Sequence, residues 1–308
     1  LLCGPRGRAA ADLLPGVDEV LTWCAPWIDP EPDPVDPAEV ADLVDRVRRR
    51  RVDVAVLLTS FHQSPLPLAL LLRLAGVPRV AAATDDYPGS LLDVRHRPAG
   101  DLPEPEAMLQ VAAAAGFPRP AGDDGRLRVR TPLPDVATRT GPPGYVVLHP
   151  GASVPARAWS PHRAAAAARE LARAGWRVVV TGDRAEKHLT AEVAGDWAVD
   201  LGGQTSLAEL AGVLAGAAAV VVGNTGPAHL AAAVGTPVVS LFAPTVPAAR
   251  WAPYGVRTVL LGDPQAPCRD TRARVCPVPG HPCLDTVTPA EVRAAVRALA
   301  GPAPGEAA

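Results

Sequence analysis

The segment from Ala219 to Pro244, AVVVGNTGPAHLAAAVGTPVVSLFAP, constrains the fold more than any other part of the chain. It opens with a short, β-branched apolar run that is typical of a buried parallel strand. Gly223 to Gly226 then supply residues that tolerate unusual backbone angles, and Pro227 suits a first helical turn. After a helix from His229 to Val234, Val238 to Leu241 indicates a second strand. The segment therefore predicts a strand, turn, helix and strand unit of an α/β protein.

The turn in this unit directs a helix N-terminus toward the carboxyl edge of a sheet. Unpaired amide groups and the positive end of the helix dipole make such a turn a favourable site for phosphate. Asn224 or Thr225 is placed to cap the helix. A plain strand-to-helix turn explains the same residues equally well, so the pattern alone leaves both interpretations open.

Composition limits the class of protein. The chain has 308 residues, which is enough for two domains of ordinary size. Its 30 Lys and Arg residues against 32 Asp and Glu give a net charge of -2, which argues against a nucleic-acid partner. A hydrophobic content of 48% with only 4% aromatic residues favours an α/β protein whose helices pack through small side chains.

Five cysteines do not form the dense, even framework of a small secreted domain. We find no signal peptide and no apolar stretch long enough to span a bilayer, so we expect a cytoplasmic protein. Cys268, Cys276, His281 and Cys283 crowd into one Pro-rich loop, where a tetrahedral metal site is conceivable. Because they include no compact Cys-x-x-Cys pair, we expect free thiols or an adventitious disulfide there and no bound metal.

Strands and helices alternate through both halves of the chain, which predicts doubly wound α/β structure in each. The stretch Pro118–Pro143 is rich in Pro, Gly, Asp and Arg, so we expect domains at residues 1–135 and 144–300. The expected strands of the first half are Val17–Leu21, Val52–Leu58 and Arg79–Ala83, and its helices are Pro37–Arg50, Leu66–Ala75 and Glu106–Ala115. In the second half the further strands are Tyr145–Leu148, Trp176–Val180, a short one at Val199 and Thr258–Leu261, and helices cover Ser160–Ala174, the residues up to Leu214, and Thr288–Leu299.

Polar loops follow two predicted strands of the first half. Open α/β sheets bind ligands at the carboxyl ends of their strands, so we expect an acceptor-side site at Ser60, His62, Gln63 and Asp86. The alternative for the first loop is that Ser64 caps the following helix and the histidine is only an exposed loop residue. For the aspartate, the alternative is a solvated or helix-capping acid.

The run Asn224 to Ala233, with the following Pro-Val-Val-Ser-Leu-Phe and Trp251-Ala252-Pro253, resembles the hallmark of glycosyltransferase family 9, the ADP-heptose:lipopolysaccharide heptosyltransferase family. The resemblance covers nearly the whole chain and is strongest from Tyr145 to Pro253. It implies a GT-B fold, with two Rossmann-like doubly wound domains facing a cleft. It also implies transfer of a heptose from ADP-heptose with inversion, and without a metal or other cofactor.

The resemblance also implies roles for individual residues. Arg157 stands where the family has a Lys close to the donor phosphates, and we expect it to be the catalytic cation, whereas Glu186 matches the family's ribose-binding Glu. An exposed arginine and a first-turn helix acid are the structural alternatives. The family's loop usually reads Asp-Ser/Thr-Gly, so Asn224 keeps the backbone donors but lacks a charge. The expected donor-binding residues are Ser153, Arg157, Gly182, Glu186, Gly203, Gln204, Thr205, Asn224, Thr225, Gly226 and His229.

The sequence begins with Leu1-Leu2-Cys3-Gly4, which is typical of the end of a buried strand. In the family a strand and a helix precede this point, and the loop between them carries an Asp proposed as the catalytic base. We therefore expect the first domain to lack its opening strand, and the chain to bind a nucleotide sugar better than it turns one over.

Two alternatives stay open. One is a nucleotide-sugar-binding remnant without turnover. The other is a nucleotide-sugar 2-epimerase, for which we would expect more acids and histidines across the cleft than the sequence contains. The expected partners are a nucleotide sugar and a glycan or small-molecule acceptor. A lipid-linked acceptor would add peripheral contact with a membrane.

Overall fold

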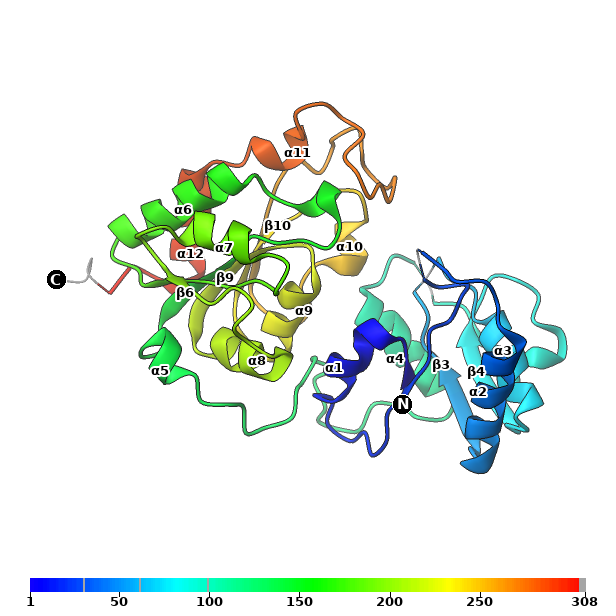
Figure 1. The fold of residues 1–308 in the computed structure, drawn as a ribbon. Coiled ribbons are helices and arrows are strands. Elements are labelled where there is room, and N and C mark those ends of the chain that lie inside the picture. Colours follow the sequence, from blue (N-terminus) through cyan, green and yellow to red (C-terminus); the bar gives the residue numbers. More distant parts are fainter. Residues whose placement is uncertain (30, 61, 99, 305–308) are drawn as a thin grey trace. The chain divides into compact units, whose positions relative to one another are not determined.

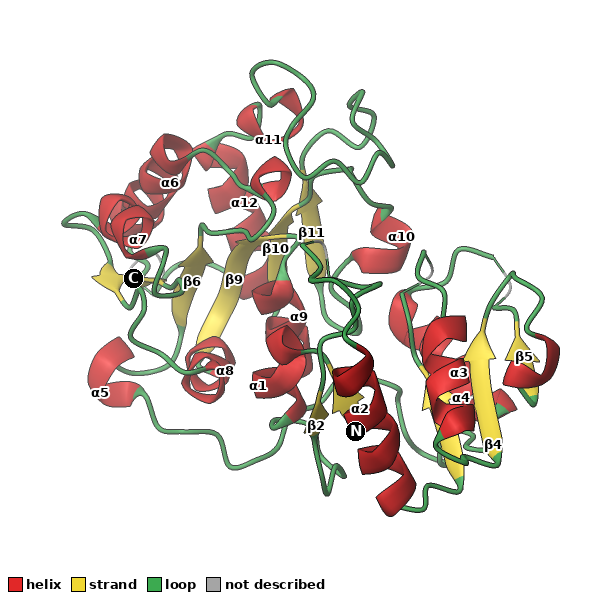
Figure 2. Ribbon diagram, turned by 45° about the vertical axis from the view of Figure 1, so that its right-hand side comes forward, coloured by secondary structure: helices red, strands yellow, loops and turns green. Residues whose placement is uncertain are grey.

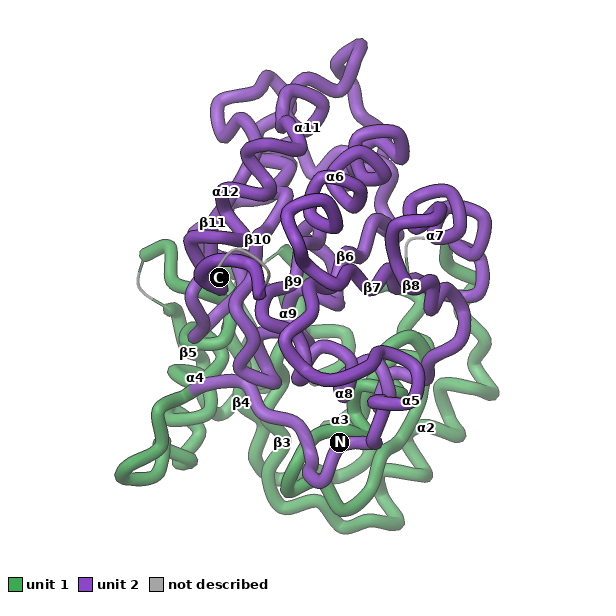
Figure 3. The backbone as a smooth tube through the Cα atoms, turned by 90° about the vertical axis from the view of Figure 1, so that its left-hand side faces the viewer, with its two compact units in different colours: residues 1–125 green, residues 126–308 purple. Residues whose placement is uncertain are grey.

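The computed structural model describes residues 1–29, 31–60, 62–98 and 100–304. It divides into two compact units, Leu1–Gly125 and Arg126–Ala308 (Figure 3). The division falls inside the Pro- and Gly-rich stretch where the sequence indicates a linker.

Unit 1 contains two separate parallel sheets. Strands β1 (Leu2–Cys3) and β2 (Leu21–Thr22) form one, and β3 (Val54–Leu57), β4 (Arg79–Ala83) and β5 (Val94–His96) form the other in that order (Figure 2). The strand expected at Val17–Leu21 begins only at its last residue, and β5 was not expected at all.

Strand β5 owes its place to tertiary contacts. The carboxylate of Asp93, just before it, accepts hydrogen bonds from the Val80 amide at 2.6 Å and from Arg73 at 2.7 Å. These bonds hold the short strand against β4, and a local sequence pattern carries no sign of them.

The helices of unit 1 begin and end within about two residues of the expected positions, as is usual for such boundaries. The Asp36 side chain caps α2 by accepting the Ala38 amide hydrogen at 2.8 Å, and Pro37 occupies the first turn. Leu43, Leu72 and Val80 pack in the core beneath these helices. The helical segments are η1 (Pro5–Gly7), α1 (Arg8–Ala11), α2 (Pro37–Arg49), α3 (Leu66–Leu74), η2 (Gly89–Leu91) and α4 (Glu104–Ala114).

Unit 2 is built on one fully parallel sheet with the strand order β11-β10-β9-β6-β7-β8. The chain enters at the centre, builds outward to β8, and then crosses back to β9 on the other side of β6. This is the doubly wound order of a Rossmann-like domain, and the order reverses between β6 and β9. The strands are β6 (Tyr145–His149), β7 (Val178–Val180), β8 (Val199–Asp200), β9 (Ala217–Gly223), β10 (Val238–Leu241) and β11 (Thr258–Leu261).

Helices cover both faces of this sheet, which explains why its strands are apolar throughout rather than alternating. Val146 and Leu148 belong to the core under α6 and α12, whereas the intervening Val147 belongs to the core under α8 and α9 (Figure 1). Each fully buried Val or Leu contributes about 1.5–3 kcal/mol to folding. The helical segments are α5 (Ala137–Thr140), η3 (Pro155–Arg157), α6 (Pro161–Arg173), α7 (Lys187–Ala194), α8 (Leu207–Ala215), α9 (Gly226–Ala233), α10 (Ala248–Trp251), α11 (Pro282–Asp285) and α12 (Pro289–Ala300).

Helix α9 begins three residues earlier than expected, at Gly226, because Pro227 lies within its first turn. This places the start of the helix directly after the turn that follows β9. Among the helices of the described residues, none combines the length and the apolar character needed to cross a membrane.

Candidate functional site

The candidate site of unit 2 lies at the carboxyl edge of its parallel sheet. Here the order of the strands reverses between β6 and β9, and open α/β sheets bind ligands at such a switch point. His149, the last residue of β6, pairs in register with Val222, so the turn after β6 begins beside the end of β9. The turns after β6, β7, β8, β9 and β10 supply the residues described next.

The turn after β9 holds two polar side-chain atoms without a hydrogen-bond partner in the described part of the chain. Thr225 is the N-cap residue of α9, as expected, but its side chain makes no capping hydrogen bond. Its Oγ1 and the Oδ1 of the buried Asn224 find no hydrogen-bond partner among the described residues, although the Asn224 amide nitrogen donates to the Ala243 carbonyl at 3.4 Å. A buried polar atom without a partner costs about 1–3 kcal/mol, so the two oxygens point to a ligand.

Arg157 lies against the same turn. The carbonyl oxygen of Arg157 would lie 3.0 Å from a Cβ atom at Gly223, so the main chains of η3 and β9 are in direct contact. The Arg157 Nε is buried and has no partner within the described part of the chain. Burial, and secondarily the Arg274 guanidinium, lower the pKa of Arg157, while burial and then Arg157 lower the pKa of His229.

An arginine keeps its charge even where burial lowers its pKa. A cation with an unused N–H group beside a helix N-terminus is suited to bind phosphate. Arg157, Asn224, Thr225 and His229 therefore come together, as the sequence analysis proposed for the donor phosphates. Gly226 is exposed at the start of α9, where a Cβ atom would have no described atom within 4 Å.

The Glu186 carboxylate covers the turns after β6 and β7. A Cβ atom at Gly151 would overlap this carboxylate, and one at Gly182 would lie 3.1 Å from its Oε2. The same Oε2 accepts the Asp183 amide hydrogen at 2.9 Å. Burial raises the pKa of Glu186, and this hydrogen bond partly opposes the increase. The lack of side chains at the two glycines thus leaves room for the Glu186 carboxylate at the strand ends, where it can accept hydrogen bonds from hydroxyl groups.

His149 is a site residue that the sequence analysis did not identify. Its Nδ1 lies 2.9 Å from the Thr181 Oγ1, and burial lowers its pKa to about 4. The ring is therefore neutral at neutral pH, and the 3.9 Å approach of its Nε2 to the Glu186 Oε2 is a polar contact rather than an ion pair. The one sequence signal for it is a histidine at the end of a buried strand, immediately before a Pro-Gly turn.

The turn after β8 is joined to the turn after β7. The Gly203 amide donates to the Gly182 carbonyl at 2.9 Å, and Gly203 has a φ of +63°, which favours glycine. The side-chain amide of Gln204 donates to the Asp200 carbonyl at 2.9 Å, so it closes its own turn. Of the other expected donor-binding residues, Thr205 is half-buried in this turn, and Ser153 is exposed after β6.

The expected acceptor-side residues lie in unit 1. The Ser60 Oγ is 3.2 Å from the His62 Nδ1, and the Gln63 amide donates to the Ser60 carbonyl at 2.8 Å. Gln63 lines a cavity of about 320 Å³ at the ends of β1, β2 and β3. Asp86 is exposed after β4, and its amide donates to the Thr84 hydroxyl at 3.2 Å. Phe61, in the same loop as Ser60, lies outside the described residues.

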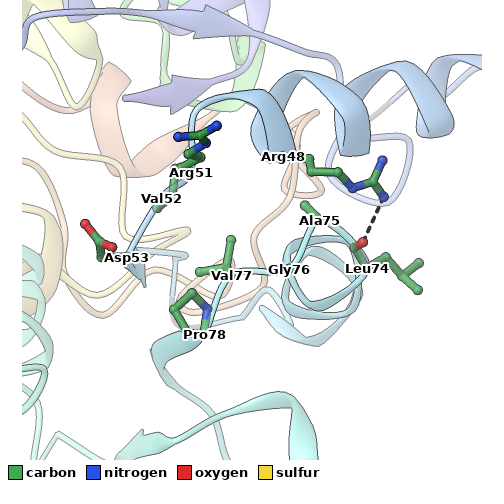
Figure 4. A pocket seen from close by; sticks show the side chains of 9 residues that line it. All are labelled: Arg48, Arg51, Val52, Asp53, Leu74, Ala75, Gly76, Val77 and Pro78. Carbon is green, nitrogen blue, oxygen red and sulfur yellow. Dashed lines mark hydrogen bonds between the residues drawn. The ribbon is translucent and has the colours of Figure 1, made fainter.

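A second cavity in unit 1, of about 440 Å³, lies at the opposite end of β3 and β4 (Figure 4). Arg48 at its rim donates to the Leu74 carbonyl at 3.0 Å. Ligands of parallel sheets bind at the carboxyl ends of the strands, so this cavity is not the candidate site.

The Cys-rich loop of unit 2 contains free thiols. Cys268 and Cys283 are buried, and burial, followed by the neighbouring Cys268, raises the pKa of Cys283 to about 12. The Cys276 thiol donates to the Val278 carbonyl at 3.3 Å. Throughout the described ranges, no group of three or more His, Cys, Asp or Glu side chains is arranged to hold a metal ion.

Comparison with known proteins adds to this geometry. The family model described as glycosyltransferase family 9 (heptosyltransferase) matches residues 41–281. Lipopolysaccharide heptosyltransferase 1 of Pseudomonas aeruginosa is 38% identical over 167 residues, which are 51% of this chain and 44% of the relative. Lipopolysaccharide heptosyltransferase 2 of Salmonella typhimurium is 28% identical over 159 residues, which are 49% of this chain and 42% of the relative. The matched segment thus spans less than half the length of either curated relative.

Solved structures share the fold. ADP-heptose lps heptosyltransferase II of E. coli superposes on this chain with a TM-score of 0.69 at 20% identity. The match covers 97% of this chain and 88% of the E. coli chain. A glycosyl transferase family 9 protein of Veillonella parvula gives a TM-score of 0.72 at 15% identity, covering 97% and 86%. The fold is therefore the GT-B fold of these proteins.

Proposed function

Because the chain belongs to glycosyltransferase family 9, we propose that unit 2 binds an ADP-sugar and that the protein transfers the sugar, a heptose or a related one, to a hydroxyl group of an acceptor. The observation that carries the proposal is the buried Arg157 Nε, which has no hydrogen-bond partner among the residues that the structure describes. The Arg157 main chain contacts Gly223, two residues before Thr225, and the charge of Arg157 acts on His229 in the first turns of α9. A diphosphate bound here would satisfy the Arg157 Nε, the Thr225 Oγ1 and the N-terminus of α9.

The chemistry of glycosyl transfer fits these groups. When the bond from the sugar to the diphosphate breaks, negative charge accumulates on the departing ADP. Arg157 and the amide groups at the start of α9 would stabilise that charge. In other enzymes a metal ion stabilises the charge of a departing diphosphate. Glu186 would accept hydrogen bonds from the ribose hydroxyls, and the turn at Gly203 to Thr205 would lie against the adenine. Attack from the opposite side of the sugar would invert its configuration.

We also propose the chemical class of the acceptor and the residues that contact it. The relatives are named for lipopolysaccharide or lipooligosaccharide, so a glycan is the acceptor that we propose. Ser60, His62, Gln63 and Asp86 are the proposed acceptor-side residues, and a general base must deprotonate the attacking hydroxyl. We propose a cytoplasmic reaction, with peripheral membrane contact only through a lipid-linked acceptor.

Calorimetric titration tests the donor site directly. We expect the chain to bind ADP more tightly than GDP or UDP. The Arg157→Gln variant should bind ADP roughly 10- to 100-fold more weakly, because a hydrogen bond to a charged group contributes about 1.5–3 kcal/mol. Arg169→Gln, which removes an exposed arginine from α6, is the matched control and should bind normally. Equal ADP binding by both variants would contradict the proposal.

A transfer assay with ADP-heptose and a glycan acceptor then separates binding from catalysis. Sugar transfer by the native chain that is lost in Arg157→Gln would support the assignment as a glycosyltransferase. ADP binding without transfer would support a binding protein without turnover.

A further inference from the structure

The loop at residues 262–281, which follows β11, is fixed to unit 2 rather than free. Ala266 and Cys268 are buried in the core that α6 and α12 cover. The Asp263 amide donates to the Cys283 carbonyl at 2.9 Å, which ties the start of the loop to α11. Because these contacts anchor the loop, the main chain of its other residues is held in a defined position.

This loop is hydrogen-bonded to the turn after β10. The Asp270 amide donates to the Pro244 carbonyl, and the Arg272 amide donates to the Thr245 carbonyl, both at 2.8 Å. Asp270 and Arg272 have φ angles of +58° and +55°, a region that costs free energy in residues other than glycine. Backbone strain of this kind is concentrated at functional sites. The Oγ1 of the buried Thr245 also has no partner in the described part of the chain.

The next part of the loop holds the turn that carries Arg157. The Ala156 amide donates to the Arg274 carbonyl at 3.0 Å, and the His281 Nε2 donates to the Ala156 carbonyl at 3.1 Å. Ala156 is thus held on both sides by the loop, and it directly precedes Arg157. The main chain of Arg274 consequently lies next to η3, at the donor site.

The Arg274 side chain is exposed, and its charge acts on Arg157. Within the described residues, neither guanidinium forms an ion pair with an acidic side chain. Two cations on neighbouring segments repel each other, and an anion that contacts both would relieve that repulsion. Asn224, which stands where the family usually has an Asp, adds no negative charge to offset them. The arrangement favours a ligand with at least two negative charges.

We propose that Arg274 is a second phosphate-binding residue, which binds the donor diphosphate together with Arg157. This inference rests on the proposed function of unit 2. The diphosphate of a nucleotide sugar carries two negative charges, which two arginines match. The leaving nucleoside diphosphate gains further charge, so Arg274 would contact it during the reaction as well as in the bound donor.

Calorimetric titration of Arg274→Gln with ADP, adenosine and inorganic pyrophosphate tests the inference. Affinity for ADP and for pyrophosphate should fall roughly tenfold or more, whereas affinity for adenosine should not change. Arg274→Lys should recover part of the loss. The melting temperature should not change, because the side chain is exposed. Arg269→Gln is the matched control, since it removes an exposed arginine that already pairs with Asp270 in the same loop.

The outcomes separate this inference from the proposed function. ADP and pyrophosphate binding as tight in Arg274→Gln as in Arg269→Gln would overturn the role of Arg274 while leaving the donor site intact. If the native chain binds no nucleoside diphosphate, the proposed function fails, and pyrophosphate still tests the arginine pair. Loss of pyrophosphate binding in Arg274→Gln would then support the pair, and no pyrophosphate binding by the native chain would overturn it.

Discussion

The carbonyl oxygen of Arg157 lies against Gly223, so closely that a Cβ atom at Gly223 would be 3.0 Å from it. The last residue of β9 thus sets the position of the η3 main chain, and through it the position of the Arg157 guanidinium. The requirement at Gly223 is therefore for a small residue rather than for an unusual φ.

We expect Gly223→Ala to weaken ADP binding about 3- to 10-fold and to lower the free energy of unfolding by about 1–2 kcal/mol, because the added methyl group pushes η3 away from β9. Titration calorimetry and urea unfolding measure the two effects. Gly4→Ala is the control, since Gly4 has a φ of -69° and a Cβ atom there meets nothing within 4 Å. Native ADP affinity in Gly223→Ala would show that η3 does not depend on this contact.

Glu186 should contribute to ADP binding only through the ribose. We expect Glu186→Gln to weaken ADP binding about 10- to 100-fold, which corresponds to the loss of about one hydrogen bond to a charged group. The same substitution should leave the affinity for 2′,3′-dideoxy-ADP unchanged, because that ligand lacks the hydroxyl groups. An equal loss for both ligands would instead indicate that Glu186 only supports the turns at Gly151 and Gly182.

We expect His149 to make the free energy of unfolding depend on pH. Its pKa is about 4 in the folded chain and about 6.5 when unfolded, so between these pH values only the unfolded chain binds the proton. The free energy of unfolding should therefore fall as the pH drops from 6.5 to 4, by on the order of 3 kcal/mol from this residue. Glu186 opposes this trend, since its pKa is raised in the folded chain.

Urea unfolding of His149→Gln from pH 4 to pH 7 checks this prediction. The variant should be less stable than the native chain at pH 7, because it loses the contact with Thr181, and its stability should depend less on pH. His188→Gln, at an exposed position on α7, should keep the native slope. A native slope in His149→Gln would assign the pH dependence to other groups.

Elements with strong local signals could be read from the sequence. Strands β4, β10 and β11 match the expected residues, because each is a short apolar run bounded by turn residues. Strand β5 could not be predicted in this way. It depends on the Asp93 carboxylate, which binds the main chain of β4 and the side chain of Arg73 from α3.

The residues of the candidate site likewise divide into those that the sequence indicates and those that only the structure reveals. The sequence places Glu186 and Thr225 just after strand ends and Arg157 just before a helix, and the resemblance to a family gives all three roles. Neither source identifies His149 or Arg274. Arg274 lies 117 positions from Arg157 in the chain, and the two are brought together by tertiary hydrogen bonds of Ala156 to the Arg274 carbonyl and to His281.

Two matched helix caps allow an effect on stability to be separated from an effect on binding. Ser206 and Glu209 form a capping box on α8, and Thr288 and Glu291 form one on α12, each with hydrogen bonds of 3.2 and 2.8 Å. Removal of either hydroxyl, by Ser206→Ala or Thr288→Val, should lower the free energy of unfolding by about 1 kcal/mol. Urea unfolding measures both losses.

Only the cap on α8 adjoins the turn proposed to contact the adenine. Glu209 also pairs with Arg139, which donates to the Gln204 carbonyl at 2.7 Å, so the box supports that turn. Ser206→Ala should therefore reduce the preference for ADP over GDP and UDP, whereas Thr288→Val should keep it. Equal preference in both variants would mean that the turn at Gly203 to Thr205 does not select the base, and that selectivity arises elsewhere in the donor site.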